Sequence, residues 1–263
     1  MSNNIEKITS FYRLCNECQQ NSNDYSISRV LMRHINDMGE MTLEILAEEA
    51  MISTSSISRF ITKAGFKNFQ EFKYILLECQ GNLYKARNKM QKITQSDVTT
   101  AEGIQRMKLM AEENINQTVT NMDVDALIEI TKLLLKAKSV SIIGDVEEQT
   151  IFLPMQLDLI SNGVPTFLYY SREVQKSHAD HLTEGDVVLF VAIAEDFFTD
   201  VQKNFLRQAK KNKAMIIAFC QDESYLDNYV DRIIYYGIPK TILNGYYSLL
   251  LLASILTDMI YQI

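Results

Sequence analysis

The hydrophobic pattern of the chain changes near residue 123. Before this point apolar residues recur at i, i+3, i+4 and i+7, and no proline occurs before Pro154. This spacing predicts α-helices. After this point, short apolar runs at 140–144, 166–170, 186–194, 214–220 and 232–236 alternate with helical stretches. Such alternation predicts an open parallel sheet with helices on both faces.

Two domains fit this change of pattern, and 263 residues suffice for two cores. We expect an all-α domain at 1–90, a linker and connecting helix at 91–122, and an α/β domain at 123–263. Further helices are expected at 124–137, 149–162, 199–213 and 242–263. Ligands of open α/β sheets bind at the carboxyl ends of the strands, so the loops there are candidate sites.

The composition is that of an ordinary globular chain, with 47% hydrophobic and 22% charged residues. Four cysteines are too few for a disulfide framework, and the polar N-terminus lacks an apolar signal core. These features favour a cytoplasmic location. The apolar stretch at 246–256 is shorter than the ~20 residues that a bilayer requires, so we expect a buried or interface helix and no membrane partner.

The net charge of −7, taken alone, argues against nucleic acid as a partner. The charge is unevenly distributed, however. Ser53–Lys92 holds eight basic and two acidic residues, whereas the chain after Lys92 holds 14 basic and 23 acidic residues. A charge run is usually only a solvated face, so it needs a motif beside it to indicate a nucleic-acid surface.

Residues 42–65 supply such a motif. Two short helical faces with i, i+3, i+4, i+7 spacing are separated by a three-residue turn: Leu43, Leu46, Ala47 and Ala50, then Ile57, Phe60, Ile61 and Ala64. Thr42 and Ser53 are expected N-caps, and Gly65 is expected to end the second helix. A small residue, Ala47, stands where the helices must cross closely. The pattern predicts a helix-turn-helix.

The outward face of the second helix carries hydroxyls and one guanidinium. Short hydroxyls near a helix N-terminus can approach base edges or phosphates, and an arginine can bond guanine bidentately. The candidate DNA-binding residues are Thr42, Ser53, Thr54, Ser55, Ser56, Ser58, Arg59, Lys63 and Lys67. Lys73 is a further candidate for phosphate contact or a solvated charge, while Phe66, Phe69 and Phe72 fit a core. A protein-interaction domain with the same two-helix packing remains an alternative.

The sequence resembles the RpiR/MurR family of bacterial transcriptional regulators. The resemblance rests on Ser58-Arg59-Phe60 and on Gly65-Phe66-Lys67-Asn68-Phe69-Gln70-Glu71-Phe72. It implies an N-terminal helix-turn-helix that binds double-stranded DNA and a C-terminal sugar-isomerase (SIS) domain. We expect a homodimer or higher oligomer, because one small reading head offers few contacts and symmetry doubles them. The helix at 242–263 and the connecting helix are candidate interfaces.

The second half departs from the phosphosugar loops of similar SIS domains. Those loops are G-x-G-x-S after the first strand and S-x-S-G-x-T after the third. The corresponding positions of this degenerate effector cleft are Gly144, Glu147 and Glu148, then Ala192, Ala194 and Glu195. Alanines lack hydroxyl donors, and a carboxylate ~4 Å from a phosphate costs about 4 kcal/mol at an effective dielectric of ~20. We expect no ordinary phosphosugar to bind there.

Three interpretations of the acidic cleft stay open. It holds an uncharged, cationic or metal-bearing effector; it is vestigial and the domain serves dimerisation; or the loop alignment is displaced by a residue or two. In the last case Ser171, Arg172 and Ser177 could form a shifted anion site.

Other chemistry is sparse. Cys15 and Cys18 lack a second pair of ligands at zinc spacing, and His178 and His181 lack a supporting ligand set. No phosphate-binding glycine loop or nucleophile motif occurs. We therefore expect no catalytic residues, no metal, no cofactor and no enzymatic activity. A sugar-phosphate isomerase or another sugar-phosphate-binding protein is the alternative from a different class.

Overall fold

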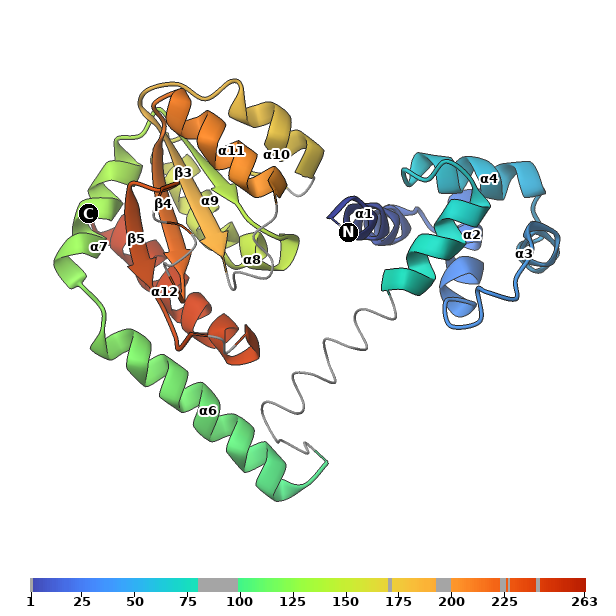
Figure 1. Ribbon diagram of the computed structural model, residues 1–263, viewed down its shortest axis with the longest axis horizontal. Coiled ribbons are helices and arrows are strands. Elements are labelled where there is room, and N and C mark those ends of the chain that lie inside the picture. Colours follow the sequence, from blue (N-terminus) through green and yellow to red (C-terminus); the bar gives the residue numbers. More distant parts are fainter. Residues whose placement is uncertain are drawn as a thin grey trace. The chain divides into compact units, whose positions relative to one another are not determined.

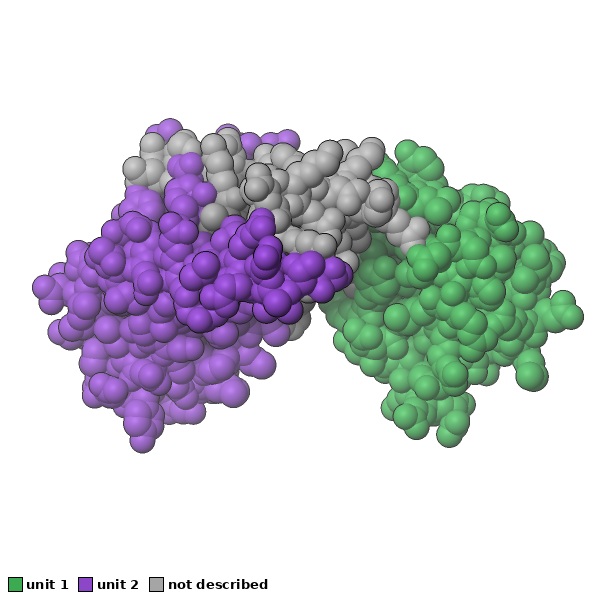
Figure 2. All heavy atoms as spheres, turned by 90° about the horizontal axis from the view of Figure 1, so that it is seen from below, with its two compact units in different colours: residues 1–95 green, residues 96–263 purple. Residues whose placement is uncertain are grey.

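The computed structural model describes residues 2–79, 99–169, 172–192, 200–222, 226, 228–239 and 242–263. Two compact units divide the chain at Met1–Gln95 and Ser96–Ile263 (Figure 2). Each unit has its own hydrophobic core and is described by itself.

The first unit is all helical. It contains α1 (Ser2–Glu17), α2 (Asn23–Arg33), α3 (Leu43–Ala50) and α4 (Thr54–Lys63), and residues 69–79 are also helical. Its core is rich in phenylalanine. The rings of Phe11 and Phe60 lie 6.4 Å apart, and those of Phe11 and Phe72 lie 5.0 Å apart. Phe66, Phe69 and Phe72 are buried, which confirms that they belong to the core.

The second unit is a parallel sheet between two layers of helices (Figure 1). Its elements are α6 (Ala101–Thr120), α7 (Val124–Leu135), β1 (Ser139–Ile143), α8 (Val146–Ile151), α9 (Leu153–Ser161), β2 (Thr166–Leu168), α10 (Arg172–Ala179), β3 (Asp186–Ala192), α11 (Asp200–Lys211), β4 (Met215–Cys220), β5 (Arg232–Tyr235) and α12 (Ile242–Gln262). The strand order is β2-β1-β3-β4-β5 and every pair is parallel. The predicted fold class is confirmed.

Burial in the sheet follows strand position. All seven residues of β3, the central strand, are buried, whereas β2 and β5 at the edges are partly exposed. The helices α7, α9 and α12 cover one face, and α10 and α11 cover the other. Helix α6, expected as a connecting helix, packs along α12 within this unit.

Two details differ from the sequence prediction. The helix expected at 149–162 is divided into α8 and α9 at Phe152, because Pro154 lies in the first turn of α9 and cannot donate a backbone hydrogen bond to the preceding turn. Helix α10 was missed, since its polar sequence leaves few apolar positions to reveal a period. Among the described helices, none is both long and apolar enough to cross a membrane.

Candidate functional site

The helix-turn-helix is formed by α3, a three-residue turn and α4. The Thr42 hydroxyl accepts a hydrogen bond from the Ile45 N–H at 3.3 Å, and the Ser53 hydroxyl accepts one from the Ser56 N–H at 3.3 Å. Both predicted N-caps are therefore confirmed. Met51, at the start of the turn, has a left-handed φ of 54° and closes α3 by donating to the carbonyls of its last turn. The caps at both ends of the turn fix where α4 begins.

One face of α4 is buried and holds the helix in place. Ile57, Phe60 and Ile61 are at most 1% exposed, and Ala64 after the helix is fully buried. This confirms the predicted inner face. Gly65 follows with a φ of 98°, a conformation that side chains other than glycine rarely adopt. The opposite face of α4 is therefore presented to solvent in a fixed orientation.

That outer face gathers hydroxyls around its N-terminus. Ser53, Ser55 and Arg59 are exposed, and so is Thr54, while Ser56 and Ser58 are half-buried. The Ser53 Oγ lies 2.9 Å from both the Ser55 Oγ and the Ser56 Oγ. Arg59 Nη2 donates to the Ser56 Oγ at 3.3 Å. Hydroxyls and a guanidinium are side chains that bond phosphates and base edges.

The lysines beside α4 behave differently from one another. Lys63 Nζ lies 2.8 Å from a carboxylate oxygen of Asp24, which raises the pKa of Lys63, although the side chain is mostly exposed. Lys67 is exposed, and its backbone N–H donates to the Glu71 carboxylate at 2.6 Å. Lys63 and Lys67 thus lie on the surface next to the helix, where a phosphate can reach them.

Lys73 does not have the role that its charge suggests. Its Nζ donates to the carbonyls of Gly39 and Met41 at 2.7 and 2.8 Å, and it lies over the ring of Phe69 at 5.5 Å. It holds the segment before α3 against the helix at 69–79. The expectation of a phosphate contact or a solvated charge is therefore replaced by a structural one.

A histidine that the sequence analysis did not select joins α2 to α3. His34 Nδ1 lies 3.0 Å from the Asp37 carboxylate, and its Nε2 contacts the Glu49 carboxylate, which also pairs with Arg33. Hydrogen bonds to Asp37 and then Glu49 raise the pKa of His34. The proximity of residues 34 and 49 depends on tertiary folding, so no local spacing could have revealed it.

The candidate effector cleft begins at Gly144, directly after β1. The Glu148 carboxylate folds back and accepts the Asp145 N–H at 3.0 Å, and Glu148 is only 5% exposed. A Cβ on Gly144 would lie 2.7 Å from Glu148 Oε2 and 3.0 Å from the Val191 carbonyl. The glycine therefore leaves space for the chain's own carboxylate. An anion of the protein occupies the turn where similar domains hold a phosphate.

Two buried glutamines fix the same turn. The Nε2 atoms of Gln149 and Gln175 each donate to the carbonyls of Gly144 and Tyr169, at distances of 2.6 to 3.0 Å. They join the end of β1 to the end of β2. Sequence analysis missed both residues, because a glutamine in a helix carries no signal of the carbonyls it will meet.

His178 belongs to the polar interior and not to a metal site. Its Nε2 lies 2.7 Å from the Ser141 Oγ and its Nδ1 lies 3.1 Å from the Tyr169 hydroxyl. Burial lowers the pKa of His178. Nowhere among the described residues do three or more His, Cys, Asp or Glu side chains cluster as metal ligands would. Burial raises the pKa of the Cys15 thiol to about 12.

The remaining cleft candidates are only partly described. Ala192 ends β3 and is buried. The Glu147 side chain, Ala194 and Glu195 lie outside the described residues, as do Ser171 and the Arg172 side chain. The Ser177 hydroxyl donates to the Val174 carbonyl within α10 and is exposed. The described residues thus bring Gly144 and Glu148 together.

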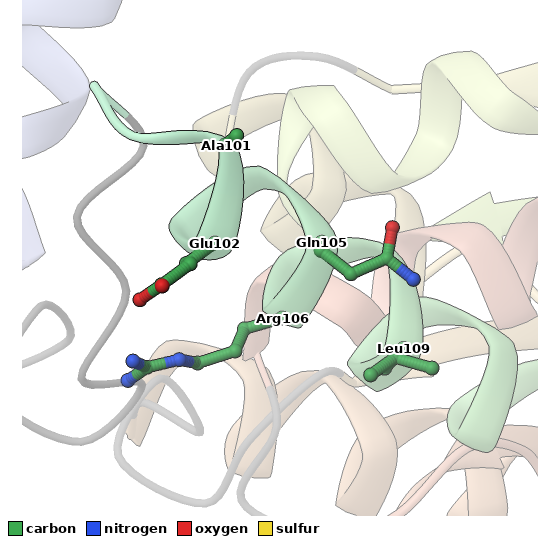
Figure 3. A pocket seen from close by; sticks show the side chains of 5 residues that line it. All are labelled: Ala101, Glu102, Gln105, Arg106 and Leu109. Carbon is green, nitrogen blue, oxygen red and sulfur yellow. The ribbon is translucent and has the colours of Figure 1, made fainter.

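A shallow hollow of about 460 Å³ lies on the first turns of α6. Ala101, Glu102, Gln105, Arg106 and Leu109 line it, and Figure 3 shows Glu102 and Arg106 pointing to the same side of the helix. All of these residues come from one helix. Ligand sites usually enclose their ligand with polar groups that converge from several elements, so this hollow is a weak candidate.

The N-terminal unit matches a known domain family. Residues 6–79 match the model of the helix-turn-helix domain of the rpiR family. An uncharacterized HTH-type transcriptional regulator of Haemophilus influenzae is 21% identical over 257 residues, which cover 92% of this chain and 83% of that protein. Another, from Clostridium perfringens, is 25% identical over 200 residues, covering 76% of this chain and 70% of that protein.

Solved structures share the fold. The Vibrio vulnificus NanR protein, complexed with ManNAc-6P, has a TM-score of 0.51 at 14% identity, covering 96% of this chain and 91% of that chain. The sugar isomerase domain of an RpiR transcription factor from Sphaerobacter thermophilus has a TM-score of 0.50 at 15% identity, covering 58% and 86%. A phosphoheptose isomerase from Francisella tularensis has a TM-score of 0.52 at 15% identity, covering 62% and 100%.

The helix-turn-helix geometry and the parallel sheet agree with these matches. By its N-terminal domain the chain belongs to the rpiR family of helix-turn-helix transcriptional regulators, and its C-terminal unit has the fold of the SIS domain.

Proposed function

We propose that the chain regulates transcription by binding double-stranded DNA with α4 in the major groove. The observation that carries this proposal is the two-sided character of α4: one face is buried, and the other presents N-terminal hydroxyls and Arg59. Ser55, Ser56, Ser58 and Arg59 contact bases or nearby phosphates. Lys63 and Lys67, together with Thr42, Ser53 and Thr54, contact the backbone of the DNA.

The test is selection of bound genomic fragments by the full chain, followed by titration of the selected duplex. Arg59→Ala should weaken binding by about 5- to 150-fold, because a bidentate base contact is worth ~1–3 kcal/mol. Arg13→Ala is the matched control, since it removes the same charge from an exposed position on α1. If both variants lose affinity equally, net charge and not the α4 surface accounts for binding.

A homodimer formed by the C-terminal unit completes this proposal. Exposed apolar side chains follow one face of α9 at Leu153, Leu157 and Ile160, and Leu250 is exposed on α12, which packs against α9. Exposed apolar stripes of this kind commonly mark interfaces. Leu157→Lys should shift the mass in light scattering toward that of a monomer. An unchanged mass would place the interface elsewhere.

The division of labour follows the expected domains. Residues 1–90 bind DNA, residues 91–122 connect, and residues 123–263 assemble the dimer and receive an effector. The location we propose is the cytoplasm, where a bacterial regulator meets DNA.

The SIS-like unit, in this proposal, has no isomerase activity and does not bind an ordinary phosphosugar. NanR is complexed with one, but in this chain the Glu148 carboxylate lies where the phosphate would meet the turn after β1. Titration with glucose 6-phosphate should give no saturable rise in melting temperature. A saturable rise that Glu148→Ala alters would contradict the proposal.

A further inference from the structure

Buried polar atoms without hydrogen-bond partners point to a second feature of the C-terminal unit. Within the described ranges they are the Oε1 of Gln149, both amide atoms of Gln221, and the Oγ of Ser248. Gln221 is 5% exposed, and Gln149 and Ser248 are fully buried. A buried polar group without a partner costs about 1–3 kcal/mol. Native proteins keep few such groups, and those that persist call for a functional explanation.

Gln221 and Ser248 lie together at the carboxyl edge of the sheet. Gln221 directly follows β4, and Gly237 follows β5 after one residue. A Cβ on Gly237 would lie 3.1 Å from the Gln221 Nε2 and 3.6 Å from the Ser248 Cβ. Both side chains therefore approach the same glycine. This edge is where open α/β sheets bind their ligands.

A second glycine keeps space for the same amide. Gly245 lies in the first turn of α12, and a Cβ there would lie 2.2 Å from the Gln221 Nε2. Two glycines thus surround a glutamine whose amide makes no hydrogen bond. A well-packed structural residue would not need this arrangement, because an apolar side chain could fill the same space.

The neighbouring polar groups are already paired. The Asn114 Oδ1 accepts the Ile238 N–H at 2.9 Å, and the Thr118 Oγ1 accepts the Gly237 N–H at 2.7 Å. Helix α6 thereby fixes the backbone after β5. The unpaired amide and hydroxyl are left as the groups that a ligand can satisfy.

The chemistry of these atoms defines a class of ligand. Both groups are neutral, and between them they can donate and accept, as the hydroxyls of a carbohydrate also do. A phosphate is disfavoured at this edge, because the Glu148 carboxylate occupies the turn after β1. We propose that Gln221 and Ser248 form a subsite for an uncharged, polyhydroxylated ligand. This inference rests on the proposed role of the C-terminal unit as the effector module.

The test compares neutral and phosphorylated probes on the full chain. Glucose, mannitol and glucose 6-phosphate are titrated to 50 mM, with binding read by saturation-transfer NMR and thermal unfolding. Glucose or mannitol should bind saturably and glucose 6-phosphate should not. Gln221→Met and Ser248→Ala should each weaken binding by about 5-fold or more, the equivalent of one lost hydrogen bond.

The variants separate a binding role from a structural one. Replacing an unpaired buried amide by an apolar side chain of similar shape is neutral or stabilising, so Gln221→Met should fold and melt no lower than the parent. Gln156→Met is the matched control: its amide donates to the Thr166 carbonyl at 2.9 Å, so this variant should lose stability and keep its affinity for the probe.

Three results would overturn the inference: no saturable binding of either neutral probe, equal or tighter binding of glucose 6-phosphate, or unchanged affinity in Gln221→Met. DNA binding is measured on the same samples. A chain that binds DNA and no neutral probe refutes this inference alone. A chain that binds a neutral probe and no DNA refutes the DNA-binding proposal alone.

Discussion

Gly144 and Glu148 should be energetically coupled, and a double-mutant cycle can measure the coupling. A Cβ on Gly144 would meet Glu148 Oε2 at 2.7 Å, the Val191 carbonyl oxygen at 3.0 Å and the Val191 Cβ at 3.3 Å. Val191 lies in the central strand and cannot move freely. Overpacking of this kind costs about 1–3 kcal/mol, so Gly144→Ala should lower the free energy of unfolding of the C-terminal unit by that amount.

Removing the carboxylate should recover part of this loss. In a Glu148→Ala background the shortest contact is gone, and the contacts with Val191 remain. Gly144→Ala should then cost about 1 kcal/mol less than in the parent chain, which lies within the range of coupling energies for residues in contact. Glu148→Ala alone should be destabilising, because the Asp145 N–H loses its charged acceptor.

Urea titration with hydrogen-exchange mass spectrometry gives the assay. Peptides from β1 and β3 report on the C-terminal unit separately from the N-terminal unit. Gly39→Ala is the control, since a Cβ there would make one ordinary contact at 3.8 Å; its effect should stay within ~0.5 kcal/mol. Equal costs of Gly144→Ala in both backgrounds would refute the placement of the Glu148 carboxylate against this turn.

Two histidines should give the units opposite responses to pH, and the core of the first unit gives a third prediction. Two carboxylates raise the folded-state pKa of His34, so its stabilising contribution is complete below the unfolded value near 6.5 and is lost as pH rises through the folded pKa; His34→Gln should remove this loss from melting curves between pH 6 and 9. Burial lowers the pKa of His178, so its contribution is complete above ~6.5 and is lost as pH falls toward the folded pKa; hydrogen exchange of β1 peptides should accelerate on acidification, and His178→Gln should suppress that change. Phe60→Ala should cost about 3–5 kcal/mol in urea unfolding of the first unit, because the ring is 1% exposed, whereas Tyr74→Ala, at a mostly exposed position, should cost under ~1 kcal/mol; similar costs would contradict the described core.

The features that could be predicted from sequence are those with local causes. The N-caps Thr42 and Ser53 and the buried face of α4 depend on spacing within one or two turns, and the structure confirms them. The strands were visible because a parallel sheet buried on both faces needs continuous apolar runs. The break before α9 was missed, although Pro154 stood in the sequence as its signal.

Features with long-range causes could not be predicted in this way. Lys73 had the appearance of a phosphate ligand until folding placed the carbonyls of Gly39 and Met41 against it. Gly144 had the appearance of a remnant of a phosphate loop, and its Cα instead borders the Glu148 carboxylate. The unpaired atoms of Gln221 become visible only when burial and partners are known for every neighbour.

The phenylalanine cluster of the first unit has a mechanical consequence. Phe11 touches both Phe60, on the inner face of α4, and Phe72, in the helix at 69–79 that precedes the second unit in the chain. Packed interiors have little free volume to absorb a displacement. A force applied along the chain at residue 79 is therefore carried through one layer of rings to the helix that faces solvent, and the angle of α4 depends on the chain segment that follows its domain.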